Sequence, residues 1–214
     1  MAYYPVNLNI AGRKCLIVGG GEVAERKALS LLAASGVIAV CSPAITPELS
    51  RLAQNGTITH INAEFHPVLM EGVFLIICAT NNTEINRLAA EAAHSKGILV
   101  NVADQPDLGN FTVPAQVAHG DLLLTVSTGG KSPALAGWLR RDLLKHYGPE
   151  YGLYLELISR LRQEFKEQLA TPGERQAVWR ESLNEEVFRL LAAGKLEDAE
   201  EKIRNAVGGS GIKS

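Results

Sequence analysis

The chain has 214 residues, of which 46% are hydrophobic, and a formal net charge of -2. This length allows one large domain or two modest ones with a sizeable core. The nearly balanced charge argues against binding to nucleic acid or a membrane surface, and no apolar stretch approaches the ~20 residues that span a bilayer. The N-terminal stretch lacks the charged start and apolar block of a signal peptide, so we expect a cytoplasmic protein.

The three cysteines, Cys15, Cys41 and Cys78, lie within or at the end of apolar, strand-like runs. Cysteine in such a run packs as a small hydrophobic residue. No Cys-x-x-Cys or Cys/His spacing indicates a metal site. We therefore expect buried free thiols and no bound metal.

Strand and helix patterns alternate through the first half of the chain. Strands are predicted at 14–18, 37–41, 57–61, 73–79 and 98–102, and helices at 22–34, 46–54 and 82–96. Thr46 is an expected N-cap, and Gly36 and Gly97 are expected to end helices. Continuous rather than alternating apolarity is typical of parallel strands covered on both faces. The fold class predicted for this region is α/β, with a Rossmann-like parallel sheet.

The pattern changes after Asp104. A polar loop leads to one further strand at 121–128 and a helix at 134–146, and the chain from 149 is almost wholly helical, with breaks near 172–173 and 194. The glycine- and serine-rich end, 208–214, predicts a flexible tail.

We predict three parts: a Rossmann-like α/β domain at 1–112, a small strand-plus-helix unit at 113–147 and a helical C-terminal domain at 148–214. One strand with one helix cannot bury both of its faces. We therefore expect the small unit to pair with its copy in a homodimer.

The glycine turn after the first strand matches the dinucleotide-binding spacing G-x-G-x-x-A. Its residues are Gly19, Gly20, Gly21, Glu22, Val23 and Ala24. The first glycine would permit a tight turn, the third would let a pyrophosphate approach, and the alanine would let the helix pack closely on the strand. The helix N-terminus would supply free N–H groups to the anion. The alternative is a glycine turn without a ligand.

An acidic residue that would bind the ribose is missing from the end of the second strand. The chain has Ser42, Pro43 and Ala44 there, and no arginine for a 2′-phosphate. Ser42 could donate one hydrogen bond or simply end the strand. The residues alone leave NAD and NADP undecided.

Asp104 follows the fifth strand, at the edge of the sheet where ligands of open α/β folds bind. A carboxylate there could take or pass on a proton while a hydride moves. The alternative is that Asp104 forms an Asx turn or caps the loop that follows.

The loop from Ser127 to Pro133 resembles an anion cradle. It offers hydroxyls, backbone amides, a lysine and a helix N-terminus through Thr128, Gly129, Gly130, Lys131 and Ser132. It lacks the spacing of a Walker A loop. The alternative is an ordinary loop in which Ser132 is the N-cap and Pro133 the first helical residue. We favour binding of a substrate with several carboxylates.

Together these stretches resemble the precorrin-2 dehydrogenase family, which includes the N-terminal half of sirohaem synthases. The resemblance covers about residues 2–147 and rests on GGGEVAERK, ICATNN, NVAD and STGGKSP in that order. Thr128 stands where some members have serine, and Gly109-Asn110 stands where many have Cys-Asp.

The resemblance implies NAD-dependent oxidation of precorrin-2 to sirohydrochlorin by a homodimer. It identifies Asp104 as the catalytic residue and places NAD contacts on 22–23 and 43–44, and the family commonly lacks the acidic ribose ligand. We also assign Thr80 to the cofactor site and Asn101 to the substrate site. The predicted partners are thus NAD, the tetrapyrrole precorrin-2 and a second copy of the chain.

Two alternative functions remain open. Some relatives also insert iron into sirohydrochlorin, and Asp104 could accept the pyrrole protons in that reaction as well. A non-catalytic NAD-sensing module would explain the glycine turn but would give no reason for Asp104 together with STGGKSP.

Overall fold

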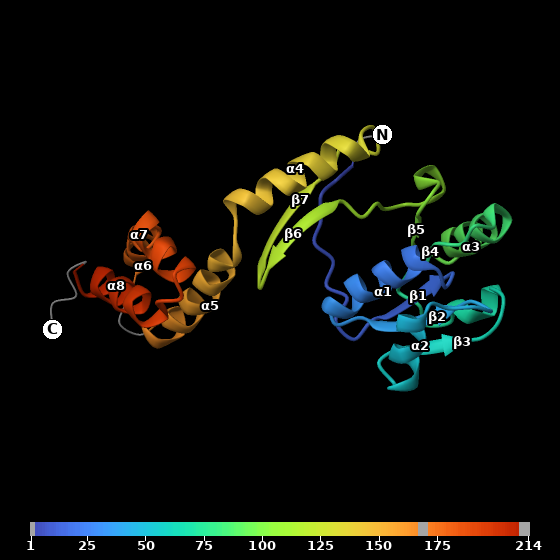
Figure 1. Cartoon of the computed structure of the whole chain (residues 1–214), viewed down its shortest axis with the longest axis horizontal. Helices are drawn as coiled ribbons and strands as arrows, with labels where there is room; N and C mark the ends of the chain where they lie inside the picture. Colours follow the sequence, from blue (N-terminus) through green and yellow to red (C-terminus); the bar gives the residue numbers. More distant parts are fainter. Residues whose placement is uncertain (1–2, 167–170, 210–214) are drawn as a thin grey trace. The chain divides into compact units, whose positions relative to one another are not determined.

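The computed structural model describes residues 3–166 and 171–209. The chain divides into two compact units, Met1–Val113 and Pro114–Ser214. The first unit contains a parallel sheet between helices, and the second contains a β-hairpin followed by helices (Figure 1). Each unit is described by itself below.

The first unit has five parallel strands in the order β3-β2-β1-β4-β5. The strands are β1 (Lys14–Val18), β2 (Val37–Cys41), β3 (Thr59–Ile61), β4 (Leu75–Cys78) and β5 (Leu99–Val102). The helices are α1 (Glu22–Ala33), α2 (Pro47–Gln54) and α3 (Thr83–Ser95), with short 3-10 turns η1 (Pro67–Met70) and η2 (Pro106–Leu108). The strand order reverses between β1 and β4. In sheets of this kind, ligands usually bind in the crevice at that point, beyond the carboxyl ends of the strands.

Alternate side chains of each central strand enter two separate cores. Cys15 and Ile17 of β1 pack with α1 and α2 on one face, and Leu16 and Val18 pack with α3 on the other. All four side chains are at most 2% exposed. Coverage on both faces explains why these strands are continuously apolar in the sequence.

The Rossmann-like prediction is confirmed. All five strands and three helices of the first unit lie where the sequence predicted them, with ends shifted by one or two residues. Thr46 caps α2 by accepting a hydrogen bond from the Leu49 N–H, and Gly97 follows α3 with a φ of +66°. Gly36 takes part in ending α1, because its N–H donates to the Leu31 carbonyl at 3.0 Å, but Ser35 takes the left-handed conformation there, with a φ of +59°. A Cβ on Gly36 would lie 3.1 Å from the Leu31 carbonyl oxygen, which is a tight contact.

The second unit begins with a strand that the sequence analysis missed. β6 (Ala115–His119) pairs with β7 (Leu122–Val126) as an antiparallel hairpin, and Gly120 turns between them with a φ of +55°. The predicted strand 121–128 corresponds to β7. The hairpin is followed by α4 (Pro133–His146), which packs against both strands.

Four further helices complete the second unit. They are α5 (Pro149–Glu164), α6 (Pro172–Glu181), α7 (Glu185–Ala192) and α8 (Leu196–Gly209). Leu157, Leu161, Val187 and Ile203 belong to their shared core. The predicted flexible tail began at 208, but α8 includes 208–209, and 210–214 lie outside the described residues.

Candidate functional site

The glycine turn connects β1 to α1 with two glycines packed against neighbouring loops. A Cβ on Gly19 would overlap the Ala79 carbonyl after β4, and a Cβ on Gly20 would overlap the Ala44 carbonyl after β2. Gly19 also has a φ of +119°, a conformation that other residues rarely adopt. The first two glycines therefore let three loops meet at the carboxyl edge of the sheet.

The third glycine has no such constraint within the protein. Gly21 is the N-cap of α1 with a φ of -82°, and a Cβ on it would meet no described atom within 4 Å. It makes no side-chain cap, so the first N–H groups of α1 are left for an outside partner. An open glycine below a helix N-terminus fits a bound anion such as a pyrophosphate.

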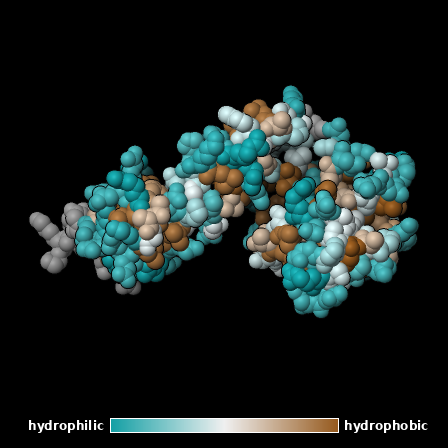
Figure 2. All heavy atoms as spheres, in the orientation of Figure 1, coloured by the Kyte–Doolittle hydropathy of each residue, from teal (hydrophilic) through white to brown (hydrophobic). Residues whose placement is uncertain are grey.

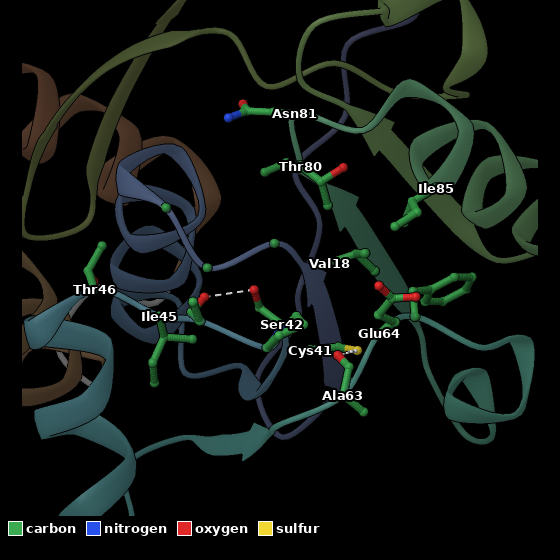
Figure 3. A pocket seen from close by; sticks show the side chains of 17 residues that line it. Val18, Cys41, Ser42, Ile45, Thr46, Ala63, Glu64, Thr80, Asn81 and Ile85 are labelled. Atoms are coloured by element: carbon green, nitrogen blue, oxygen red, sulfur yellow. Dashed lines mark hydrogen bonds between the residues drawn. The ribbon is translucent and has the colours of Figure 1, made fainter.

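A pocket of about 480 Å³ lies over this turn (Figure 3). Its walls include Gly19–Gly21, the loop 42–46 after β2, and Thr80 and Asn81 after β4. This volume is within the range of small-molecule sites. The lining includes seven of the ten residues predicted to bind the cofactor, namely Gly19, Gly20, Gly21, Ser42, Pro43, Ala44 and Thr80. The other three, Glu22, Val23 and Ala24, form the first turn of α1 and do not line the pocket.

Hydrogen bonds fix the loop after β2. The Ser42 hydroxyl donates to the Ala44 carbonyl at 2.7 Å, as the dashed line in Figure 3 marks. His60 of β3 donates from Nε2 to the Ser42 carbonyl at 2.9 Å. At the other end of the loop, the Thr46 hydroxyl donates to Glu25 of α1 at 2.5 Å. The loop is therefore held in place before any ligand binds.

The pocket also holds a carboxylate that the sequence pattern does not predict. Among the described residues that line it, Glu64 is the one with a charged side chain. Glu64 follows β3, which pairs with β2, so it lies next to the position after β2 where an acidic residue was missing. The sequence does not show that β2 and β3 are neighbours, so it gives no signal that Glu64 lies in this pocket.

Asp104 follows β5 at the same edge of the sheet, and its side chain is exposed. The Asn86 amide of α3 donates to Asp104 Oδ1 at 3.3 Å. Burial, together with the negative charge of Asp104, raises the pKa of the neighbouring Cys78 thiol to about 12. Cys78 is thus a buried, protonated thiol at neutral pH, and Asp104 is the group with an accessible charge.

Asn101 of β5 is 6% exposed, and its amide donates to the Phe111 carbonyl at 3.1 Å. The side-chain Oδ1 of Asn110 accepts from the Val100 N–H at 2.8 Å. Both bonds hold the loop after η2 against the edge strand β5. The contribution of Asn101 to substrate binding stays a prediction.

The loop Thr128–Ser132 belongs to the second unit. Ser132 caps α4 by accepting from the Leu135 N–H at 3.2 Å, and Pro133 is the first helical residue, as predicted. Thr128 Oγ1 accepts from the Ser132 N–H at 3.2 Å. Gly129 and Gly130 have φ values of +62° and +77°. Capping therefore accounts for the hydroxyls, and anion binding by Lys131 stays a prediction.

Within the described part of the chain, no three His, Cys, Asp or Glu side chains are grouped so that they could hold a metal ion. No described helix is long and apolar enough to cross a membrane.

Comparison with known families accounts for nearly the whole chain. Residues 6–115 match the family model described as putative NAD(P)-binding, which is just over half of the chain. The chain belongs to this NAD(P)-binding family. Residues 120–146 match the central region of sirohaem biosynthesis proteins, and residues 150–207 match the dimerisation region of sirohaem synthase.

Individual relatives agree with the family. The chain is 38% identical over 199 residues to siroheme synthase 1 of Aeromonas salmonicida and 39% identical over 208 residues to siroheme synthase of Nitrosomonas europaea. These matches cover 93% and 97% of this chain but 41% and 44% of the relatives. The chain therefore spans less than half the length of the curated relatives it matches.

A solved structure of SirC, a precorrin-2 dehydrogenase, has the same fold over its full length. The TM-score is 0.79 at 26% identity, with 95% of this chain and 100% of SirC covered. The resemblance to the precorrin-2 dehydrogenase family is thereby confirmed.

Proposed function

We propose that this protein oxidises precorrin-2 to sirohydrochlorin with NAD as the oxidant. The observation that carries the proposal is the placement of Asp104 and the glycine turn at one edge of one sheet, connected through Asn86 and Thr80. The likeness to SirC over its full length supports the same reaction.

The described residues fit NAD. The open position at Gly21 and the free N–H groups of Glu22, Val23 and Ala24 receive the pyrophosphate. The loop 42–44 and Thr80 form the walls on either side of the dinucleotide. When bound, NAD supplies an acceptor for two electrons and one proton in the form of a hydride.

Asp104 takes the second hydrogen. Oxidation of precorrin-2 to sirohydrochlorin removes two hydrogens, one as hydride and one as a proton, and the proton goes to the Asp104 carboxylate. One carboxylate oxygen accepts from Asn86, which leaves the other free to face a substrate. The exposure of Asp104 gives a large macrocycle access to it.

The acid side chains of precorrin-2 bind the loop of the second unit. Lys131 and the backbone amides around Gly129 and Gly130 provide positive charge and hydrogen-bond donors for carboxylates.

The enzyme acts as a homodimer in the cytoplasm. No side chain of α4 is buried in the single chain, and Leu135 and Trp138 are 47% and 56% exposed. Figure 2 shows hydrophobic atoms at the surface where α4 and the hairpin lie. A second copy would cover this apolar face. The three free cysteines are compatible with a reducing compartment.

Absorbance spectroscopy of the purified chain with precorrin-2 separates this function from its alternatives. We expect sirohydrochlorin and NADH to form together, in equal amounts, when NAD is present and neither to form without it. NAD binding with no conversion of precorrin-2 would instead support a sensing module. Cobalt insertion into purified sirohydrochlorin without NAD would add a chelatase activity.

A further inference from the structure

Asn86 is a polar side chain of α3 that is buried against the sheet. It lies in the first turns of α3 and is fully buried, at 0% exposure, beside the alanines of the same helix that pack on the sheet. A buried amide is costly unless all of its hydrogen-bonding groups have partners. Its retention inside the core therefore needs an explanation.

Every hydrogen-bonding position of the Asn86 amide is occupied. Its Nδ2 group donates to the Thr80 carbonyl at 3.0 Å and to Asp104 Oδ1 at 3.3 Å. Its Oδ1 atom accepts from the Thr80 hydroxyl at 2.9 Å and from the Thr80 N–H at 3.4 Å. The Thr80 N–H can only donate and the Asp104 carboxylate only accepts at neutral pH, so the amide cannot be flipped.

The two partners of Asn86 belong to different parts of the proposed site. Thr80 lies in the wall of the cofactor pocket, after β4, and Asp104 lies after β5. Among the described residues, Asn86 supplies the hydrogen bond that the Asp104 side chain receives. One rigid, buried amide thus joins the cofactor wall to the carboxylate.

We infer that Asn86 is a positioning residue that aligns the Asp104 carboxylate with the cofactor. The inference rests on the function proposed above. By holding Oδ1, the amide sets the direction in which the second carboxylate oxygen faces the substrate. By holding Thr80 at the same time, it fixes the position of that oxygen relative to the Thr80 wall of the pocket. Small displacements of a catalytic group can cost up to ~100-fold in rate.

Two substitutions remove the donor in different ways. Asn86→Asp keeps the size and the oxygen that accepts from Thr80 but replaces the amide nitrogen by an oxygen. Asn86→Ser introduces no charge and is too short to reach Asp104. Asn82→Asp is the matched control, because Asn82 caps the same helix through its Oδ1 atom, which aspartate also provides.

Steady-state kinetics with precorrin-2 and saturating NAD measures the effect. We expect kcat to fall ~10–100-fold in both Asn86 variants, with KM for precorrin-2 and Kd for NAD within ~3-fold of wild type. The Asn82→Asp variant should stay within ~2-fold in all three. Thermal unfolding of each variant gives the fraction of molecules that are folded, and kcat is expressed per folded molecule. A loss of kcat that remains after this correction reflects positioning and not loss of fold.

A double-mutant cycle shows whether Asn86 acts through Asp104. In an Asp104→Asn background, Asn86→Ser should lower the residual single-turnover rate by less than ~2-fold. The same loss in both backgrounds would overturn the inference, as would an unchanged kcat in the single variants. A wild-type chain that does not oxidise precorrin-2 would overturn the proposed function, and the inference with it.

Discussion

Each of the three glycines after β1 has a different physical reason to be glycine. Gly20 is confined by the Ala44 carbonyl, whereas Gly21 is open to the pocket. The sequence spacing predicted that the turn would follow a strand and start a helix, and this is confirmed. The spacing could not separate the glycine that the fold requires from the glycine that leaves room for a ligand, because that depends on contacts with the distant loops after β2 and β4.

The contrast between these two glycines gives a direct prediction. Gly21→Ala should change the unfolding free energy by no more than ~1 kcal/mol, since its Cβ meets no described atom and its φ suits alanine. The same change should weaken NAD binding at least ~10-fold, because the methyl group enters the space for the pyrophosphate. Titration calorimetry and urea unfolding measure the two effects.

Gly20→Ala is the matched comparison. Its Cβ would overlap backbone, so this variant should lose ~1–3 kcal/mol of stability. Unchanged NAD affinity in Gly21→Ala would show that the pyrophosphate does not lie over this helix end.

Glu64 predicts a preference for NAD over NADP. The described residues that line the pocket include this carboxylate and no lysine or arginine, so a 2′-phosphate would meet negative charge without compensation. Glu64→Gln should raise the affinity for NADP relative to NAD by ~3–10-fold, an effect limited by the exposure of the side chain.

Competition binding of the two cofactors measures this ratio. Glu71→Gln is the control, because it removes the same charge from an exposed position outside the pocket lining. An equal shift in both variants would trace the effect to net charge rather than to Glu64.

At the scale of elements, the sequence predicted the first unit well and the hairpin poorly. β4 and residues 15–18 of β1 are apolar because α1 and α3 cover opposite faces of the sheet, and this leaves a clear pattern in the sequence. β6 has the sequence AQVAH with a single buried residue, Val117, so it carries no comparable signal. Asn86 and Asp104 are 18 residues apart and meet only because β4 and β5 are neighbours, which spacing alone does not predict.

An ion-pair network between α5 and α8 predicts how the helical part responds to acid. Arg204 bonds to Glu164 at 2.7 Å and to Glu200 at 2.7 Å, and these bonds hold the pKa of both carboxyls below the ordinary value of 4.5. A lowered folded-state pKa adds stability above the unfolded-state value, and this stability is lost as pH falls through the folded-state value. The unfolding free energy should therefore decrease below pH 4.5.

Arg204→Gln should reduce this decrease, because both carboxyls then titrate more nearly as they do in the unfolded chain. Tryptophan fluorescence during urea unfolding at pH 7 and pH 4 measures it selectively, since both tryptophans, Trp138 and Trp179, belong to the second unit. An equal decrease in unfolding free energy between pH 7 and pH 4 in wild type and variant would show that the Arg204 ion pairs do not contribute to the pH dependence.

At the scale of the whole molecule, the exposed face of α4 predicts association. The sequence predicts that residues 113–147 form the dimer interface. The family model described as the dimerisation region of sirohaem synthase instead matches residues 150–207. Trp138→Glu puts a charge on the exposed apolar face of α4 and should convert a dimer to a monomer, as measured by light scattering during gel filtration. NAD affinity should not change, because the cofactor residues belong to the first unit.

Val68→Glu is the control, because Val68 is a 66% exposed apolar residue of the first unit. A Trp138→Glu protein that remains a dimer would contradict an interface on α4 and would favour one formed by 150–207 alone.

The evidence for the proposed substrate comes from the similarity of the whole chain and not from any single residue. The glycine turn and the sheet establish a nucleotide fold that serves many reactions, and fold alone does not determine function. Asp104 is the group to which we assign proton transfer, and its hydrogen bond from Asn86 connects it to Thr80 in the pocket wall. The proposal of precorrin-2 as the substrate rests on the family likeness, because no contact among the described residues of the first unit distinguishes one macrocycle from another.

The most direct test of the account is the rate of NADH formation from precorrin-2 by the Asp104→Asn variant, measured beside its Kd for NAD. Asparagine keeps the shape of the side chain and loses the ability to accept a proton. We predict a loss of ~100-fold or more in kcat with NAD affinity within ~3-fold of wild type. NADH formation at the wild-type rate would contradict the assignment of proton transfer to Asp104.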